Sequence, residues 1–183
     1  MLTADEALLR LKDGNRKYCA QAGIGDVSAA VRERTLHEGQ TPYAVILACA
    51  DSRVIPESIF TAGIGELFVI RAAGNVTDGA ILGSIEYAVA HLGCKLVVVM
   101  GHEKCGAVNA AMQDDYEGPI GTITRAIRAA FTGEADEMTV CRRNVERQAA
   151  LISRELHLND AGVKTIGAIY RLSDGTVEFI ENL

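Results

Sequence analysis

The sequence predicts an α/β fold with a mostly parallel central sheet, helices on its faces and one antiparallel strand at its edge. Short apolar runs rich in Val, Ile and Leu, typical of strands covered on both faces, alternate along the chain with segments of helical periodicity. Near the carboxyl terminus, the dipeptide Asp174-Gly175 is a strong hairpin signal. The last strand should therefore pair antiparallel with the strand before it.

The elements follow from local signals, beginning with helices in residues 1–40. The first helix should begin at Thr3, which forms a capping-box pattern with Glu6. Asp78 is the candidate N-cap of a later helix that runs to about residue 92. We also expect strands over residues 43–50, 67–71, 95–101 and 163–170. Further helices should span residues 56–61, 122–131 and 139–157, and another should begin at about Cys105. A tight turn is expected at Gly74 and Asn75.

Composition indicates a single domain over residues 1–183, because 49% of the positions are hydrophobic. Within this domain, we expect residues 1–40 to form an amino-terminal helical arm. The net charge of -6, from 18 basic and 24 acidic side chains, disfavours nucleic acid and anionic membranes as partners. No apolar run reaches the length of a membrane span, and the amino terminus lacks the pattern of a secretory signal. Five cysteines, an odd number, fit a reducing compartment. We therefore expect a cytoplasmic protein.

Two short clusters of metal-ligand residues lie where predicted strands end. Cys49 lies at the end of the run over 43–50, and His102 with Cys105 follows the run over 95–101. In open α/β sheets, ligands bind beyond the carboxyl ends of the strands, so neighbouring strands can present both clusters to one metal ion. Two thiolates and one imidazole leave a fourth tetrahedral position open. These two cysteines and one histidine favour a catalytic zinc ion. A closed structural site would need a fourth Cys or His, and the remaining alternative is that the cysteines are merely buried.

Asp51 and Arg53 follow Cys49 at two-residue spacing. In an extended segment all three side chains point to the same side. A carboxylate beside zinc can bind the metal or accept a hydrogen bond from water on the metal. Arg53 can form a bidentate pair that keeps Asp51 ionised and oriented. If Asp51 became the fourth ligand instead, the site would be closed and inactive.

Four segments, CADSRVIPE, GELFVIRAAGN, GSIEYAV and GHEKCGAV, occur in this order and resemble the signature segments of the β-class carbonic anhydrases. The resemblance extends from LKDGNRKY to GAIYRLSDGTVEF and is loosest after Ala111, and Ala72 replaces an asparagine that is common in the family. It implies a β-carbonic-anhydrase-like fold, one zinc ion per subunit and a homodimer or tetramer. It also implies residue roles: Cys49, His102 and Cys105 as zinc ligands, Asp51 and Arg53 as a catalytic pair, and Gln40, Phe68 and Tyr87 as a substrate pocket of the plant-like branch, completed across a dimer interface.

The reaction that this resemblance implies is the reversible hydration of carbon dioxide to bicarbonate and a proton, through attack of zinc-bound hydroxide on carbon dioxide. Gln40 would donate an amide hydrogen to a bicarbonate oxygen, while Phe68 and Tyr87 would form apolar walls for carbon dioxide. Asp51, held by Arg53, would orient the hydroxide. Two thiolates cancel the charge of the metal, so its water should be less acidic than at an all-histidine site, which predicts activity favoured by alkaline pH.

Three other interpretations remain open. A hydrolase of carbonyl sulfide or carbon disulfide would use the same site on another linear, electrophilic substrate. A noncatalytic zinc-binding structural or regulatory homologue would keep the metal without turnover, although such a site needs neither Asp51 nor Arg53. A thiol redox protein is disfavoured because the chain has no Cys-x-x-Cys motif. No function is assigned to the remaining cysteines, Cys19, Cys94 and Cys141.

Overall fold

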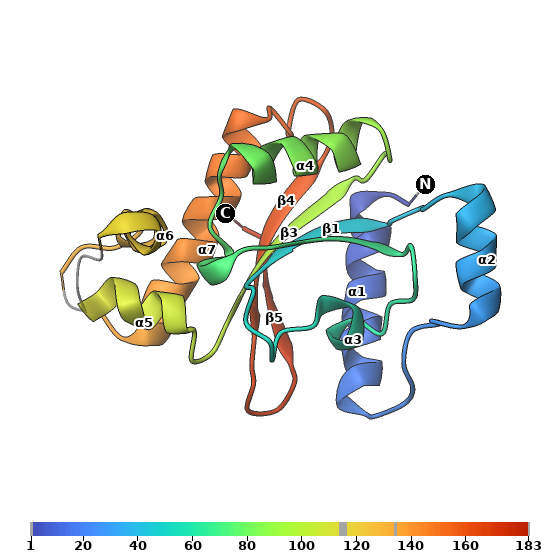
Figure 1. Cartoon of the computed structure of the whole chain (residues 1–183), viewed down its shortest axis with the longest axis horizontal. Coiled ribbons are helices and arrows are strands. Elements are labelled where there is room, and N and C mark those ends of the chain that lie inside the picture. Colours follow the sequence, from blue (N-terminus) through green and yellow to red (C-terminus); the bar gives the residue numbers. More distant parts are fainter. Residues whose placement is uncertain (1, 114–116, 134, 183) are drawn as a thin grey trace.

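The computed structural model describes residues 2–113, 117–133 and 135–182. In these residues one five-stranded sheet has the order β2-β1-β3-β4-β5. Its first four strands pair in parallel, and β5 pairs antiparallel with β4 at the edge (Figure 1). The predicted fold class is therefore confirmed. The strands are β1 (Ala44–Ala48), β2 (Leu67–Arg71), β3 (Leu96–His102), β4 (Lys164–Tyr170) and β5 (Val177–Ile180).

Several helices begin at a residue whose side chain caps the first turn. The capping box at Thr3 is confirmed, because its side chain accepts from the Glu6 amide while the Glu6 carboxylate accepts from the Thr3 amide. Asp78 caps its helix as predicted. The helix expected from residue 139 begins two residues earlier, because the Asp136 side chain accepts from the amides of its first turn. The helices are α1 (Ala4–Cys19), α2 (Ala29–Glu38), α3 (Pro56–Ile59), α4 (Gly79–Ala90), α5 (Gly106–Gln113), α6 (Gly118–Arg128), α7 (Glu137–Glu155) and a 3₁₀ turn, η1 (Ala73–Asn75).

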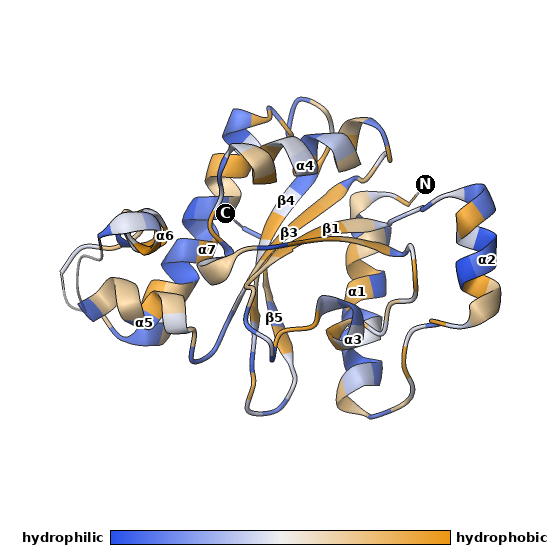
Figure 2. Cartoon of the chain, viewed as in Figure 1, coloured by the Kyte–Doolittle hydropathy of each residue, from blue (hydrophilic) through white to orange (hydrophobic). Residues whose placement is uncertain are grey.

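β1 and β3 are buried along their whole length, as their apolar sequences predict. Figure 2 shows that these central strands are mostly hydrophobic. Along β1, Val45 and Leu47 face one core cluster, while Ile46 faces the other. Helices α4 and α7 cover the first face, and α1 and α3 cover the second (Figure 1). Each fully buried aliphatic side chain of this kind stabilises the fold by about 1.5–3 kcal/mol. The two cores fix the positions of the strand ends.

Two glycines let α7 lie directly against the sheet. A Cβ atom at Gly101 would stand 2.7 Å from Val145 Cγ2 and 2.8 Å from Cys141 Sγ, and one at Gly167 would stand 2.7 Å from Val145 Cγ1. All three distances are too short for a side chain at either glycine position. Because Gly101 precedes the last residue of β3, the close approach brings α7 to the end of that strand.

Residues 2–40 contain two helices. α1 packs on the sheet through a buried stripe that includes Leu8 and Leu11. α2 stands at the outer edge of the molecule with Val31 as its buried residue (Figure 1). Around α2, Ile24 and Leu36 are largely exposed. Among the described helices, none has both the length and the apolar character that a membrane crossing requires.

Candidate metal centre

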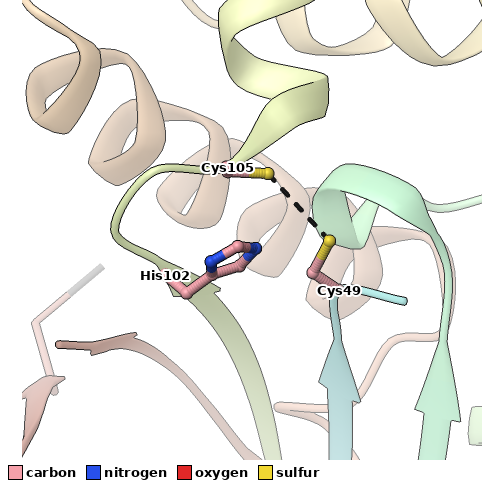
Figure 3. Close-up of side chains that lie close together, drawn as sticks. All are labelled: Cys49, His102 and Cys105. Atoms are coloured by element: carbon pink, nitrogen blue, oxygen red, sulfur yellow. Dashed lines mark hydrogen bonds between the residues drawn. The ribbon is translucent and has the colours of Figure 1, made fainter. Parts of the chain in front are cut away.

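The site is built at the carboxyl ends of two adjacent strands. β1 and β3 pair in parallel, so their ends lie at the same edge of the sheet. Cys49 directly follows β1, and His102 is the last residue of β3. The chain then turns, and Cys105 lies just before α5. Figure 3 shows the three side chains pointing toward one another. The fold thus brings together the metal-ligand residues that the sequence predicts.

The three ligand atoms fit a single metal ion. All three lie within 4.8 Å of one another, the side chains are buried, and the Cys49 and Cys105 sulfurs are 4.0 Å apart (Figure 3). His102 Nδ1 lies 2.8 Å from the carbonyl oxygen of Glu103, so this nitrogen carries the proton and donates it. His102 Nε2 is buried and has no hydrogen-bond partner among the described residues. A buried, unpartnered ring nitrogen beside two thiols is the arrangement that a metal ion would satisfy.

A hydrogen bond between the two thiols shifts their pKa values in opposite directions. A hydrogen bond with Cys105 lowers the pKa of Cys49 to about 4, and contacts with His102 and the Gly74 amide act in the same direction. The same pairing raises the pKa of the Cys105 thiol. Cys49 is therefore the thiol of the pair that loses its proton more readily, and a metal ligand binds as the thiolate.

Asp51 and Arg53 form the bidentate pair that their spacing predicts. Arg53 Nε donates to Asp51 Oδ1 at 2.9 Å, and Nη2 donates to Oδ2 at 2.7 Å. The segment is not extended, because the chain turns here and the Arg53 amide also donates to Oδ1. The Arg53 hydrogen bond holds the pKa of Asp51 well below its usual range. Asp51 Oδ2 lies 3.9 Å from His102 Nε2, so an ionised carboxylate borders the three ligands.

Further contacts at the site involve residues that sequence reasoning missed. Arg71 donates through Nε to the carbonyl oxygen of Cys49 at 3.1 Å and through Nη2 to that of Asp51 at 2.6 Å. The sequence signal for Arg71 was its position as a basic residue at the end of an apolar run. Its partners could not be predicted, because they depend on the pairing of β2 with β1. The predicted turn at Gly74 is confirmed, and its amide donates to Cys49 Sγ at 3.3 Å.

The three predicted pocket residues lie away from the metal ligands of their own chain. Gln40 precedes β1 and Cys49 follows it, so the strand alone separates them by roughly 15 Å. Phe68 pairs in register with Val45, near the start of β1. The Phe68 and Tyr87 rings are 6.2 Å apart, and Tyr87 is 48% exposed. Within one chain, Phe68 and Tyr87 thus lie together but away from that chain's metal ligands.

Comparison with known proteins gives consistent matches. A family model described as carbonic anhydrase matches residues 44–177. The carbonic anhydrase of Mycolicibacterium smegmatis is 38% identical over 94% of this chain and 91% of that protein. Carbonic anhydrase 2 of Mycobacterium tuberculosis is 37% identical over 90% of this chain and 87% of that protein.

Solved structures agree with these relatives. The β-carbonic anhydrase CafA of Aspergillus fumigatus has a TM-score of 0.74 at 25% identity, over 97% of this chain and 90% of that one. A tetrameric β-carbonic anhydrase of Sordaria macrospora has a TM-score of 0.73 at 26% identity, over 82% of this chain and 86% of that one. The chain therefore belongs to the β-class carbonic anhydrase family, and it is an enzyme of that family.

Proposed function

We propose that this enzyme catalyses the reversible hydration of carbon dioxide to bicarbonate and a proton, with one zinc ion held by Cys49, His102 and Cys105. The observation that carries the proposal is the buried Cys₂His cluster beside an ionised Asp51–Arg53 pair. Two thiolates on a tetrahedral zinc ion, with Zn–S bonds of about 2.3 Å, lie roughly 3.8 Å apart. The observed separation of 4.0 Å is close to that value.

The chemistry divides between the metal and the chain. When bound, zinc supplies a Lewis acid that generates a hydroxide nucleophile from water under mild conditions. Asp51 accepts a hydrogen bond from the attacking oxygen and so fixes its orientation. Arg53 keeps Asp51 ionised and holds both carboxylate oxygens, which prevents the side chain from rotating. A noncatalytic zinc protein has no use for such a pair, so the pair favours turnover.

We also propose a homodimer or tetramer in which a second copy supplies Gln40, Phe68 and Tyr87 to the substrate pocket. The distance of Gln40 from the metal ligands of its own chain supports this arrangement, as does the exposure of Tyr87. The relative from Sordaria macrospora is tetrameric. All five cysteines are free thiols, which agrees with the reducing cytoplasm as the location that we propose.

The proposal predicts metal-dependent turnover. Stopped-flow measurement near pH 8.5 should show carbon dioxide hydration by zinc-loaded protein, loss of that activity after metal removal, and recovery on adding zinc back. Asp51→Ala should lower kcat/KM by about 10²-fold, the range typical of an acid–base group, while the zinc content stays at one per chain. Asp160→Ala, which removes an exposed carboxylate, is the matched control and should behave as the parent.

Two outcomes would contradict this assignment. Equal activity of parent and Asp51→Ala would show that the carboxylate has no part in the reaction. A zinc-loaded parent that hydrolyses carbonyl sulfide or carbon disulfide but does not hydrate carbon dioxide would move the assignment to the sulfur substrates.

A further inference from the structure

Helix α7 carries two fully buried amides on a face that is otherwise apolar. Asn144 is 0% exposed and Gln148 is 2% exposed. They are four residues apart, so they lie one above the other on the same side of the helix. Burying an amide costs free energy unless both of its polar atoms find partners. The partners of these two amides therefore indicate what the pair contributes.

Both amides contact the chain that surrounds η1. Asn144 Nδ2 donates to the carbonyl oxygen of Gly74 at 2.9 Å. Gln148 Oε1 accepts from the amide of Thr77 at 3.1 Å. Gln148 Nε2 donates to Asn144 Oδ1 at 3.3 Å, which links the two side chains into one unit. α7 thus fixes the turn at two points on the sequence, one at its centre and one just after it.

Gly74, which Asn144 holds, also contacts a predicted metal ligand. The Gly74 amide donates to Cys49 Sγ at 3.3 Å. Gly74 has a φ of +66°, and a Cβ atom there would stand 2.7 Å from Ile127 Cδ1. The backbone must therefore keep this left-handed conformation, free of a side chain, to place its N–H group on the sulfur. Holding the carbonyl group of Gly74 restrains the orientation of the whole residue.

We propose that Asn144 and Gln148 are positioning residues of the metal centre, which hold Gly74 so that its amide donates to the Cys49 thiolate. The hydrogen bond withdraws negative charge from the sulfur. A metal ion on Cys49 then receives less charge from its ligands and is a stronger Lewis acid. This offsets part of the charge donated by two thiolates. The inference rests on the proposed function, since it needs a metal ion on Cys49.

The hydrogen bond can be detected without any activity measurement. In protein loaded with cadmium-113, a scalar coupling between the Gly74 amide proton and the metal, transmitted through the sulfur, reports the N–H···S contact. In protein loaded with cobalt(II), the sulfur-to-cobalt charge-transfer band reports the electron density on the thiolates. Asn144→Ala should abolish the coupling and move the band to lower energy. Competition with a chelator should show metal affinity lower by about 10- to 100-fold, as is typical when a partner of a metal ligand is removed.

Asn15 offers a matched control on the other face of the sheet. It is a buried asparagine of α1, donates to the carbonyl oxygen of Gly175 at 2.9 Å and accepts from the Val177 amide at 3.0 Å. Asn15→Ala likewise removes the hydrogen bonds of a buried asparagine to the backbone, but away from the metal ligands. It should lower stability while leaving the coupling, the charge-transfer band and the metal affinity as in the parent.

The outcomes separate a positioning role from a merely structural one. If Asn144→Ala and Gln148→Met lose stability but keep the parent's coupling and charge-transfer band, the inference is wrong and the proposed function stands. If Asn144→Ala does not fold, Gln148→Met decides alone, because it keeps the side-chain length and removes the contact to Thr77. Its coupling should be weaker than the parent's, and an unchanged coupling overturns the inference. A parent that binds neither metal overturns both the inference and the proposed function.

Discussion

At the scale of single residues, the Asp51–Arg53 pair is the contact on which the proposed chemistry depends most. The guanidinium holds both carboxylate oxygens and also donates to the carbonyl oxygen of Lys104 at 3.1 Å, so it joins the two ligand loops. Arg53→Lys keeps the charge but has no planar fork. We expect kcat/KM to fall by about 10-fold or more while the zinc content stays constant, as measured by stopped-flow hydration and metal analysis.

The pH dependence of this loss follows from the sign of the pKa shift. Arg53 lowers the pKa of Asp51, so removing the bidentate contact raises that pKa toward its usual value of 3.8. Asp51 then remains ionised in both proteins above about pH 6. The ratio of parent to variant activity should therefore be constant between about pH 6.5 and 9. A ratio that changes across this range would show that Arg53 acts through protonation of Asp51 rather than through its orientation. Arg154→Lys, at an exposed site near the end of α7, is the matched control.

At the scale of elements, the close approach of α7 to the sheet is what brings its side chains to the strand ends. Val145 fills the space above both Gly101 and Gly167, so the three residues form one contact between helix and sheet. Gly167→Ala would place a methyl group 2.7 Å from Val145 Cγ1. We expect the free energy of unfolding to fall by about 1–3 kcal/mol, the usual cost of overpacking, as measured by urea denaturation.

A double-mutant cycle tests whether this contact is the cause. Val145→Ala removes the methyl groups that the new Cβ would meet, so the double variant Gly167→Ala/Val145→Ala should lose less stability than the two single losses added together. The interaction free energy should be about 0.5–3 kcal/mol, in the range typical of residues in contact. Losses that add to within about 0.5 kcal/mol would show that Val145 and Gly167 do not share a packing constraint.

At the scale of the whole molecule, the sequence predicts what depends on local pattern and misses what depends on packing. The strands and the cluster of Cys49, His102 and Cys105 were predictable, because apolar runs mark parallel strands whose ends share one edge. Arg71 was not, since its partners are set by the register of β2 against β1. Asn144 was not either, because nothing local tells which loop a helix will contact.

Residues proposed to act between subunits form a third class, because their position at a site would depend on the assembly. Gln40 is the clearest example, since its own chain places it at the opposite end of β1 from the metal ligands. If a second copy supplies it, Gln40→Ala should bind zinc as the parent does. Its kcat/KM should be lower by about 10- to 100-fold, the value of a hydrogen bond to a charged group.

Mixed oligomers test whether Gln40 acts across subunits. Co-expression of Gln40→Ala with Cys49→Ser gives dimers in which one site has an intact metal cluster and faces an intact Gln40. With random pairing, half of the dimers are mixed and one of their two sites is complete, so activity should return to roughly a quarter of the parent value. Co-expression of Cys49→Ser with His102→Ala should restore nothing, because both chains lack a metal ligand. If Gln40 acts on the site of its own chain, no mixed dimer contains a complete site, and activity stays at the level of the two variants measured separately.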